Sequence, residues 1–256
     1  MNAKELFAKL CEYAPIELSN KLVELEDGYD NSGIILDCDL DTKKILFCLD
    51  LTHESVDYAI GKECGIIVTH HPAIYSPIKR LNEKNPLLRC AVNSISVISM
   101  HLNLDCAKNG IDYYLSKGLG GEDITILTEL GDGVGYGRVA SVDTTAGELL
   151  ERYKKEFSTE KAWLFGDKNQ KITKIASFCG SGLGLKEIDF AIKSGAEMLI
   201  SADVSHHVLK EAIELGLCVL SCTHYSTENY GMKKVFEYFN DNLKEKIYFF
   251  DDERFV

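Results

Sequence analysis

The stretch Ile66-Ile-Val-Thr-His70-His71-Pro72 decides how this sequence folds. Its short apolar run is typical of a buried β-strand, and Pro72 restricts His71 to extended or turn geometry. Adjacent side chains of a strand point to opposite faces, so both imidazoles can serve one site only where the strand ends. Taken alone, a surface pair of histidines without a role is the simpler interpretation. The rest of the chain favours a ligand site.

Three further segments repeat this pattern, each after a short apolar run. They are His101-Leu-Asn-Leu-Asp105, Ala-Asp203-Val-Ser-His206-His207 and His224-Tyr-Ser-Thr-Glu228. Together with the first stretch they contain six of the seven histidines, all but His53. Imidazoles are neutral nitrogen ligands near neutral pH, and carboxylates can bridge two cations. The sequence therefore predicts a site for divalent metal ions.

Strand-like and helix-like runs alternate along most of the chain, which favours an α/β fold with largely parallel sheets. In such sheets the ligand site lies beyond the carboxyl ends of the strands, where all four segments are expected. The predicted strands are 34–37, 44–49, 66–69, 96–100, 174–179, 197–201, 217–222 and 246–250, and the predicted helices are 53–64, 86–93, 145–157, 185–194, 207–215 and 227–239.

The glycine-rich stretch Gly131-Asp-Gly-Val-Gly-Tyr-Gly137 is the expected join between two α/β halves. Residues 1–130 would then form the first half, with His70, His71 and Asp105. Residues 131–256 would form the second, with Asp203, His224 and Glu228. The boundary is approximate, and the halves could interleave.

Composition narrows the class of protein. The 256 residues carry a net charge of −12, which argues against tight binding to a nucleic-acid backbone. No apolar run approaches the ~20 residues that span a bilayer, and the first residues read as an amphipathic helix rather than a signal peptide. Nine cysteines, without a CxxC pair, are expected to be reduced and mostly buried. A cytoplasmic protein is expected.

Each proposed ligand also has a structural interpretation. His224 and Glu228 would share one face of a helix as ligands, or Glu228 could simply favour the helix start. Asp105 could bridge two cations, or it could cap a helix. Asp203 and His206 resemble ligands or acid–base groups, although a polar helix start explains them about as well.

Weaker signals surround these segments. The turn Phe178-Cys-Gly-Ser-Gly-Leu-Gly184 could bind an anion, but it lacks the lysine of a P-loop and a structural turn explains it equally well. Lys79 and Arg80 could hold a phosphate, with a solvated loop as the alternative. Cys222 precedes His224 by two residues, and a thiolate ligand there is the less favoured interpretation.

Taken together and in order, these motifs resemble the dinuclear-metal family known as type 2 GTP cyclohydrolase I, also called the NGG-one-interacting-factor-like family. The resemblance runs from about Glu17 to the carboxyl end. The chain resembles the short form of the family, and it has Tyr29 before Asp30 where a tryptophan is common. The motifs that carry it are Tyr29-Asp30-Asn31-Ser32-Gly33, Asp50-Leu-Thr52, Val68-Thr-His70-His71-Pro72, His101-Leu-Asn103-Leu-Asp105, Cys179-Gly-Ser-Gly182, Ala202-Asp203 with His206, and His224-Tyr-Ser-Thr-Glu228.

The resemblance implies two α/β halves with two divalent ions, Zn, Mn or Fe, in the cleft between them, and a ring-shaped homohexamer. His101 would line the site, with His101 or His206 relaying protons. The implied activity is that of a metal-dependent hydrolase acting on a nucleotide or related small molecule, with GTP opened at C8 of its guanine ring in the family's named reaction. The alternative is a metal-binding scaffold or regulatory partner with little turnover. The implied metal ligands are His70, His71, Asp105, His224 and Glu228.

Overall fold

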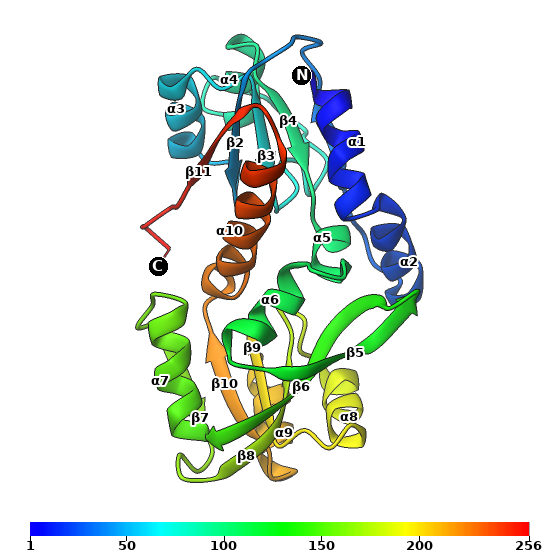
Figure 1. Ribbon diagram of the computed structural model, residues 1–256, viewed down its shortest axis with the longest axis vertical. Helices are drawn as coiled ribbons and strands as arrows, with labels where there is room; N and C mark the ends of the chain where they lie inside the picture. Colours follow the sequence, from blue (N-terminus) through cyan, green and yellow to red (C-terminus); the bar gives the residue numbers. More distant parts are fainter. Residues whose placement is uncertain (256) are drawn as a thin grey trace. The chain divides into compact units, whose positions relative to one another are not determined.

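The structure is a computed structural model that describes residues 1–255, and it is mixed α/β, as predicted (Figure 1). The chain forms two compact units, each with its own sheet. Unit 1 comprises Met1–Ala107 and Met232–Glu253, and unit 2 comprises Lys108–Gly231 with the residues from Arg254. The chain leaves unit 1 at Ala107 and returns to it at Met232, so the units interleave, which the sequence analysis allowed, and the first crossing lies at Ala107 rather than near residue 130.

The expected join at Gly131–Gly137 is a hairpin inside one sheet. It connects strand β5 (Glu122–Gly131) to strand β6 (Val134–Thr145), which pair antiparallel. Gly131 and Gly133 have φ values of 99° and 70°, a left-handed conformation that glycine adopts without steric cost. The glycines thus serve a tight turn, and the expectation of a linker here was wrong.

The sheet of unit 1 has the strand order β1-β4-β3-β2-β11. Strands β4, β3, β2 and β11 run parallel, and β1 is antiparallel to β4. The parallel pairs β2–β3 and β3–β4 need crossover connections, which α3 and α4 provide. The bounds are β1 Gly33–Leu36, β2 Lys44–Cys48, β3 Ile66–Thr69, β4 Ser96–Ser99, β11 Lys246–Phe250, α3 His53–Lys62 and α4 Pro86–Val92.

Helices cover both faces of this sheet, so its strands are apolar on both sides. Successive residues of β2 alternate between the faces. Leu46 packs in the core under α3 and α4, whereas Phe47 stacks on Phe239 of helix α10 (His224–Asn242) with ring centroids 5.7 Å apart. Helix α1 (Ala3–Tyr13) contacts β1 and β4 (Figure 1). Two further helices, α2 (Ile16–Glu26) and α5 (Leu102–Cys106), contact each other.

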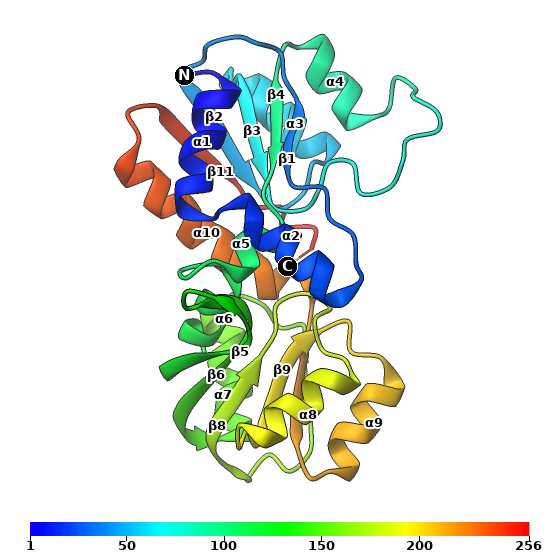
Figure 2. The same cartoon turned by 90° about the vertical axis from the view of Figure 1, so that its right-hand side faces the viewer.

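The sheet of unit 2 has the order β5-β6-β8-β9-β10-β7 and is mixed rather than largely parallel. Its central strands β8, β9 and β10 are parallel, and the others pair antiparallel. Helices α8 and α9 pack on the same face (Figure 2). The remaining bounds are β7 Ala162–Phe165, β8 Lys171–Ser177, β9 Met198–Ala202, β10 Cys218–Cys222, α6 Ile111–Gly118, α7 Ala146–Glu156, α8 Leu185–Lys193 and α9 His206–Glu214.

Within residues 1–255, none of the helices combines the length and the apolar character that crossing a membrane requires.

Candidate metal centre

In unit 1, ligand-type side chains follow three neighbouring parallel strands. Asp50 follows β2, the pair His70–His71 follows β3, and His101 follows β4. Neighbouring strands lie ~4.8 Å apart, so residues just beyond their carboxyl ends are brought close together. The ring centroid of His70 lies 5.0 Å from that of His71 and 5.2 Å from that of His101. One ring nitrogen of each histidine lies within 4.8 Å of the others, and these three residues could hold a metal ion.

Each of the three imidazoles is oriented through its Nδ1 atom. The partners are a backbone carbonyl and two carboxylates, groups that accept hydrogen bonds. Nδ1 therefore carries the proton, and Nε2 keeps the lone pair that a metal ligand or a general base needs. The bonds run from His70 to the Met100 carbonyl (2.9 Å), from His71 to Asp50 Oδ1 (2.7 Å) and from His101 to Asp30 Oδ1 (2.7 Å).

Asp30 is held as an anion under His101. Burial alone would raise the pKa of this carboxyl, but hydrogen bonds from His101, Ser19 and Ser32 outweigh burial and hold the pKa well below its usual range. The Ser32 hydroxyl also accepts the backbone N–H of His101 at 2.9 Å. These hydrogen bonds thus fix the orientation of the His101 imidazole and favour the tautomer with the proton on Nδ1.

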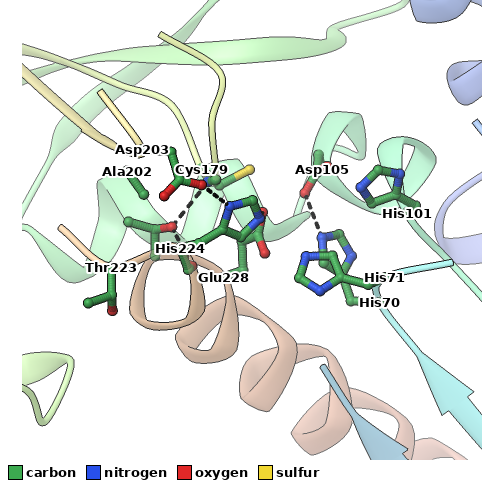
Figure 3. Close-up of polar contacts among 12 residues, drawn as sticks. His70, His71, His101, Asp105, Cys179, Ala202, Asp203, Thr223, His224 and Glu228 are labelled. Carbon is green, nitrogen blue, oxygen red and sulfur yellow. Dashed lines mark hydrogen bonds and ion pairs between the residues drawn. The ribbon is translucent and has the colours of Figure 1, made fainter. Parts of the chain in front are cut away.

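Asp105 lies in the short helix α5 with a buried side chain (Figure 3). Its Oδ1 atom is 3.5 Å from Nε2 of His70. Two ligands about 2.05 Å from one tetrahedral metal ion are ~3.3 Å apart, so this pair fits the edge of a metal site. Because the side chain is buried beside an imidazole, the ligand interpretation of Asp105 is favoured over a solvent-facing helix cap.

In unit 2, the carboxyl ends of β9 and β10 carry a second imidazole–carboxylate group. His224 Nδ1 bonds Asp203 Oδ2 at 2.6 Å, and His224 Nε2 lies 3.1 Å from Glu228 Oε1 (Figure 3). Glu228 is buried, whereas Asp203 is exposed and has a left-handed φ of 49°. Such a backbone conformation is uncommon for a non-glycine residue and is frequent at functional sites. The carboxylate of Asp203 orients the ring of His224, and Glu228 lies on the other side of that ring at a spacing that two metal ligands could have.

The glycine-rich turn after β8 packs against this pair. Gly180 has a φ of 55°, and a Cβ atom there would overlap Glu228 Oε1 and lie 3.0 Å from His224 Nε2. The backbone N–H of Gly180 donates to Thr227 Oγ1 at 3.1 Å, which ties the turn to helix α10. The turn therefore packs directly against the side chains of His224 and Glu228. This contact favours the interpretation of the glycine-rich motif as a structural turn.

The side chain of Asp112, which is fully buried in helix α6, forms hydrogen bonds that fix the same turn. Its two oxygens accept the backbone N–H groups of Cys179 (2.8 Å) and Gly137 (2.5 Å). Burial raises the pKa of Asp112, although the nearby Arg138 guanidinium and these two donors act to lower it. A buried carboxylate thereby connects the turn to β6.

Replacing Asp112 with Asn is expected to lower the free energy of unfolding of unit 2 by about 1–3 kcal/mol. The amide has one acceptor oxygen, so one of the two buried N–H groups would lose its partner. Urea unfolding measures the change. Asp143→Asn, which removes an exposed partner of Lys171 in the same unit, is the control and should change stability by less than ~1 kcal/mol. Equal stability of Asp112→Asn and wild type would contradict this role.

The remaining sequence predictions have different outcomes. His206 begins helix α9 with an exposed side chain, and its role as a proton relay stays a prediction. Cys222 is buried, and burial raises the pKa of its thiol to about 12. A thiolate ligand at this position stays the less favoured interpretation. Neither Asp30 nor Asp50 was predicted to orient a histidine. One signal was present for Asp50, which follows strand β2 as His70 follows strand β3.

Known proteins are similar to this chain in sequence and in fold. The family described as Duf34/NIF3 (NGG1p interacting factor 3) matches residues 1–254. A protein of Clostridium acetobutylicum named GTP cyclohydrolase 1 type 2 homolog is 30% identical over 89% of this chain and 85% of its own length. NGG1-interacting factor 3 of Saccharomyces cerevisiae is 29% identical over 79% of this chain and 80% of its own. The solved structure of reduced HcgD from Methanocaldococcus jannaschii superposes with a TM-score of 0.80 at 31% identity, covering 98% of both chains. This chain belongs to the Duf34/NIF3 family.

Proposed function

We propose that this protein is a hydrolase that depends on two divalent metal ions and acts on a nucleotide or a related small molecule. The proposed ligands are His70, His71 and Asp105 from unit 1, with His224 and Glu228 from unit 2. The proposal includes a cytoplasmic location, expected from the composition, and assembly into a homohexamer, expected from the family resemblance.

The observation that carries the proposal is that each unit supplies one imidazole–carboxylate pair at ligand spacing. The nitrogen–oxygen distances are 3.5 Å for His70–Asp105 and 3.1 Å for His224–Glu228. Both are close to the ~3.3 Å edge of a tetrahedral site. In each pair Nδ1 of the imidazole is held by an acceptor, as is usual for histidines that bind metals. Two such pairs support two ions rather than one.

Bound ions would supply a Lewis acid and lower the pKa of water in the site. The chain's own groups would then position and deprotonate that water. Asp30 fixes the proton of His101 on Nδ1, so Nε2 of His101 can accept a proton as a general base. His101 could instead complete a three-histidine ligand set, given its closeness to His70 and His71. We favour the base, because Asp105 already supplies His70 with a carboxylate partner.

The donor set accepts Zn, Mn or Fe with the same geometry. The names of curated relatives make GTP the first substrate to test, with formate released when the guanine ring opens at C8. A metal-binding scaffold or regulatory partner is the second candidate function, favoured by the family's description as an interacting factor.

The test combines metal analysis with turnover. Protein purified without added metal is measured by elemental analysis, and formate release from GTP is then followed with each metal. We expect up to two ions per chain, loss of at least one ion in His70→Ala, and loss of metal-dependent turnover in that variant. His53→Ala, which removes an exposed histidine at the start of α3, is the control. Full metal content in His70→Ala would overturn the ligand set. Bound metal without turnover, across GTP and other nucleotides, would favour the scaffold.

A further inference from the structure

Two exposed tyrosines lie next to the histidine cluster of unit 1. The side chains of Tyr29 and Tyr75 are 55% and 57% exposed, although both are large aromatic groups. Their ring centroids are 6.0 Å apart in an edge-to-face arrangement, and the ring of Tyr75 also meets the imidazole of His101 edge-on at 6.4 Å. Apolar groups exposed together at a site commonly mark a surface where a ligand binds.

Hydrogen bonds fix the segments that carry these rings. Asn31, two residues after Tyr29, donates from Nδ2 to the carbonyl of Ile74 at 2.7 Å. Ile74 directly precedes Tyr75, so one bond joins both tyrosine-bearing segments. Asp30, directly after Tyr29, accepts the Nδ1–H of His101. The two rings and the imidazole therefore belong to one connected structure, and a ligand would find the aromatic surface already formed.

We propose that Tyr75, supported by Tyr29, is the stacking surface for a planar heteroaromatic ring of the substrate. More than half of the Tyr75 side chain is exposed, so a planar ring can stack in an offset arrangement on the open part of this aromatic surface. Any nucleobase has a π-face and can stack in this way. Because the ring of Tyr75 adjoins His101, a ring held on it has its edge near the His70–His71–His101 cluster.

That the stacked ring belongs to a molecule that is then hydrolysed rests on the proposed hydrolase function. The stacking itself involves no metal. Tyr75 is a specificity-determining residue here, since it selects substrates that carry a flat aromatic group. Tyr29 acts by holding the ring of Tyr75 in place. A substrate without a planar ring would gain nothing from either residue.

The experiment measures binding of guanosine 5′-monophosphate to metal-free protein, by calorimetry and by saturation-transfer NMR at the base proton H8. Wild type is expected to bind, with saturation transferred to H8. Tyr75→Leu should bind about 10-fold or more weakly, since loss of one aromatic stacking partner commonly has this effect. Tyr75→Phe keeps the ring and should bind within about 2-fold of wild type. Ribose 5-phosphate, which has the sugar and phosphate but no base, should bind far more weakly.

Tyr238→Leu is the matched control. Tyr238 is also an exposed tyrosine of unit 1, and it packs on Tyr13 rather than on a histidine. Its variant should bind guanosine 5′-monophosphate like wild type. Equal binding by Tyr75→Leu and wild type, no binding by wild type, or equal binding of ribose 5-phosphate would each overturn the proposal. Because the protein carries no metal in this test, these outcomes are independent of metal content and turnover, on which the hydrolase proposal depends.

Discussion

Replacing Asp105 with Asn is expected to lower metal-dependent hydrolysis more than about 100-fold and to leave the metal-free fold intact. Partners that only orient a ligand commonly contribute 10- to 100-fold, and a bridging ligand should contribute more. The amide has nearly the volume of the carboxylate, so the buried site in α5 keeps its packing. It is neutral, however, and cannot bridge two cations as a carboxylate does. Formate release from GTP, or hydrolysis of the substrate found by screening, measures the effect.

Two controls separate a ligand from a structural residue at position 105. The melting temperature of metal-free Asp105→Asn should stay close to that of metal-free wild type, while its metal content falls. The control variant is Asp57→Asn. It removes an exposed carboxylate of helix α3 that pairs with Arg89 of helix α4, and it should keep both metal and activity. Undiminished activity in Asp105→Asn would remove the bridging role. A large loss of stability without metal would show that Asp105 acts in folding instead.

The part of the site that could be predicted from sequence is local. Ile66–Thr69 is buried throughout and runs directly into two histidines, so both the strand and the position of these histidines at its end could be predicted. The same reasoning held for the runs before His101 and His224, which are strands β4 and β10. Parallel pairing then follows from the intervening helices, and it brings these strand ends together within each unit.

The groups that orient the histidines could not be predicted in this way. Asp30 is 71 residues from His101 along the chain, and nothing in the local sequence connects the two.

The hairpin of β5 and β6 was not predicted, for another reason. Its register shifts near Glu122–Thr125 and Glu129–Gly131 interrupt the apolar alternation by which strands are recognised, and its turn glycines resemble a linker. Long-range contacts and irregular pairing are properties of the folded chain.

Replacing Gly180 with Ala is expected to remove about one metal ion per chain, although Gly180 itself offers no ligand atom. The added Cβ would overlap the Glu228 carboxylate and press on the imidazole of His224. Both are the ends of side chains that can rotate away, so the fold should survive while the 3.1 Å pair is lost. Elemental analysis of purified protein measures the change, and spectra of a Co²⁺-substituted sample would report the loss of nitrogen ligation.

A second glycine provides the matched control for that variant. Gly216 has a φ of 82°, and a Cβ there meets no atom within 4 Å. Gly216→Ala therefore carries a comparable left-handed backbone cost of roughly 1–2 kcal/mol without touching a ligand. We expect Gly216→Ala to keep its full metal content and Gly180→Ala to lose the ion bound by His224 and Glu228. If both variants lose metal equally, backbone strain rather than displacement of Glu228 is the cause. If both keep it, the His224–Glu228 pair is not a metal site.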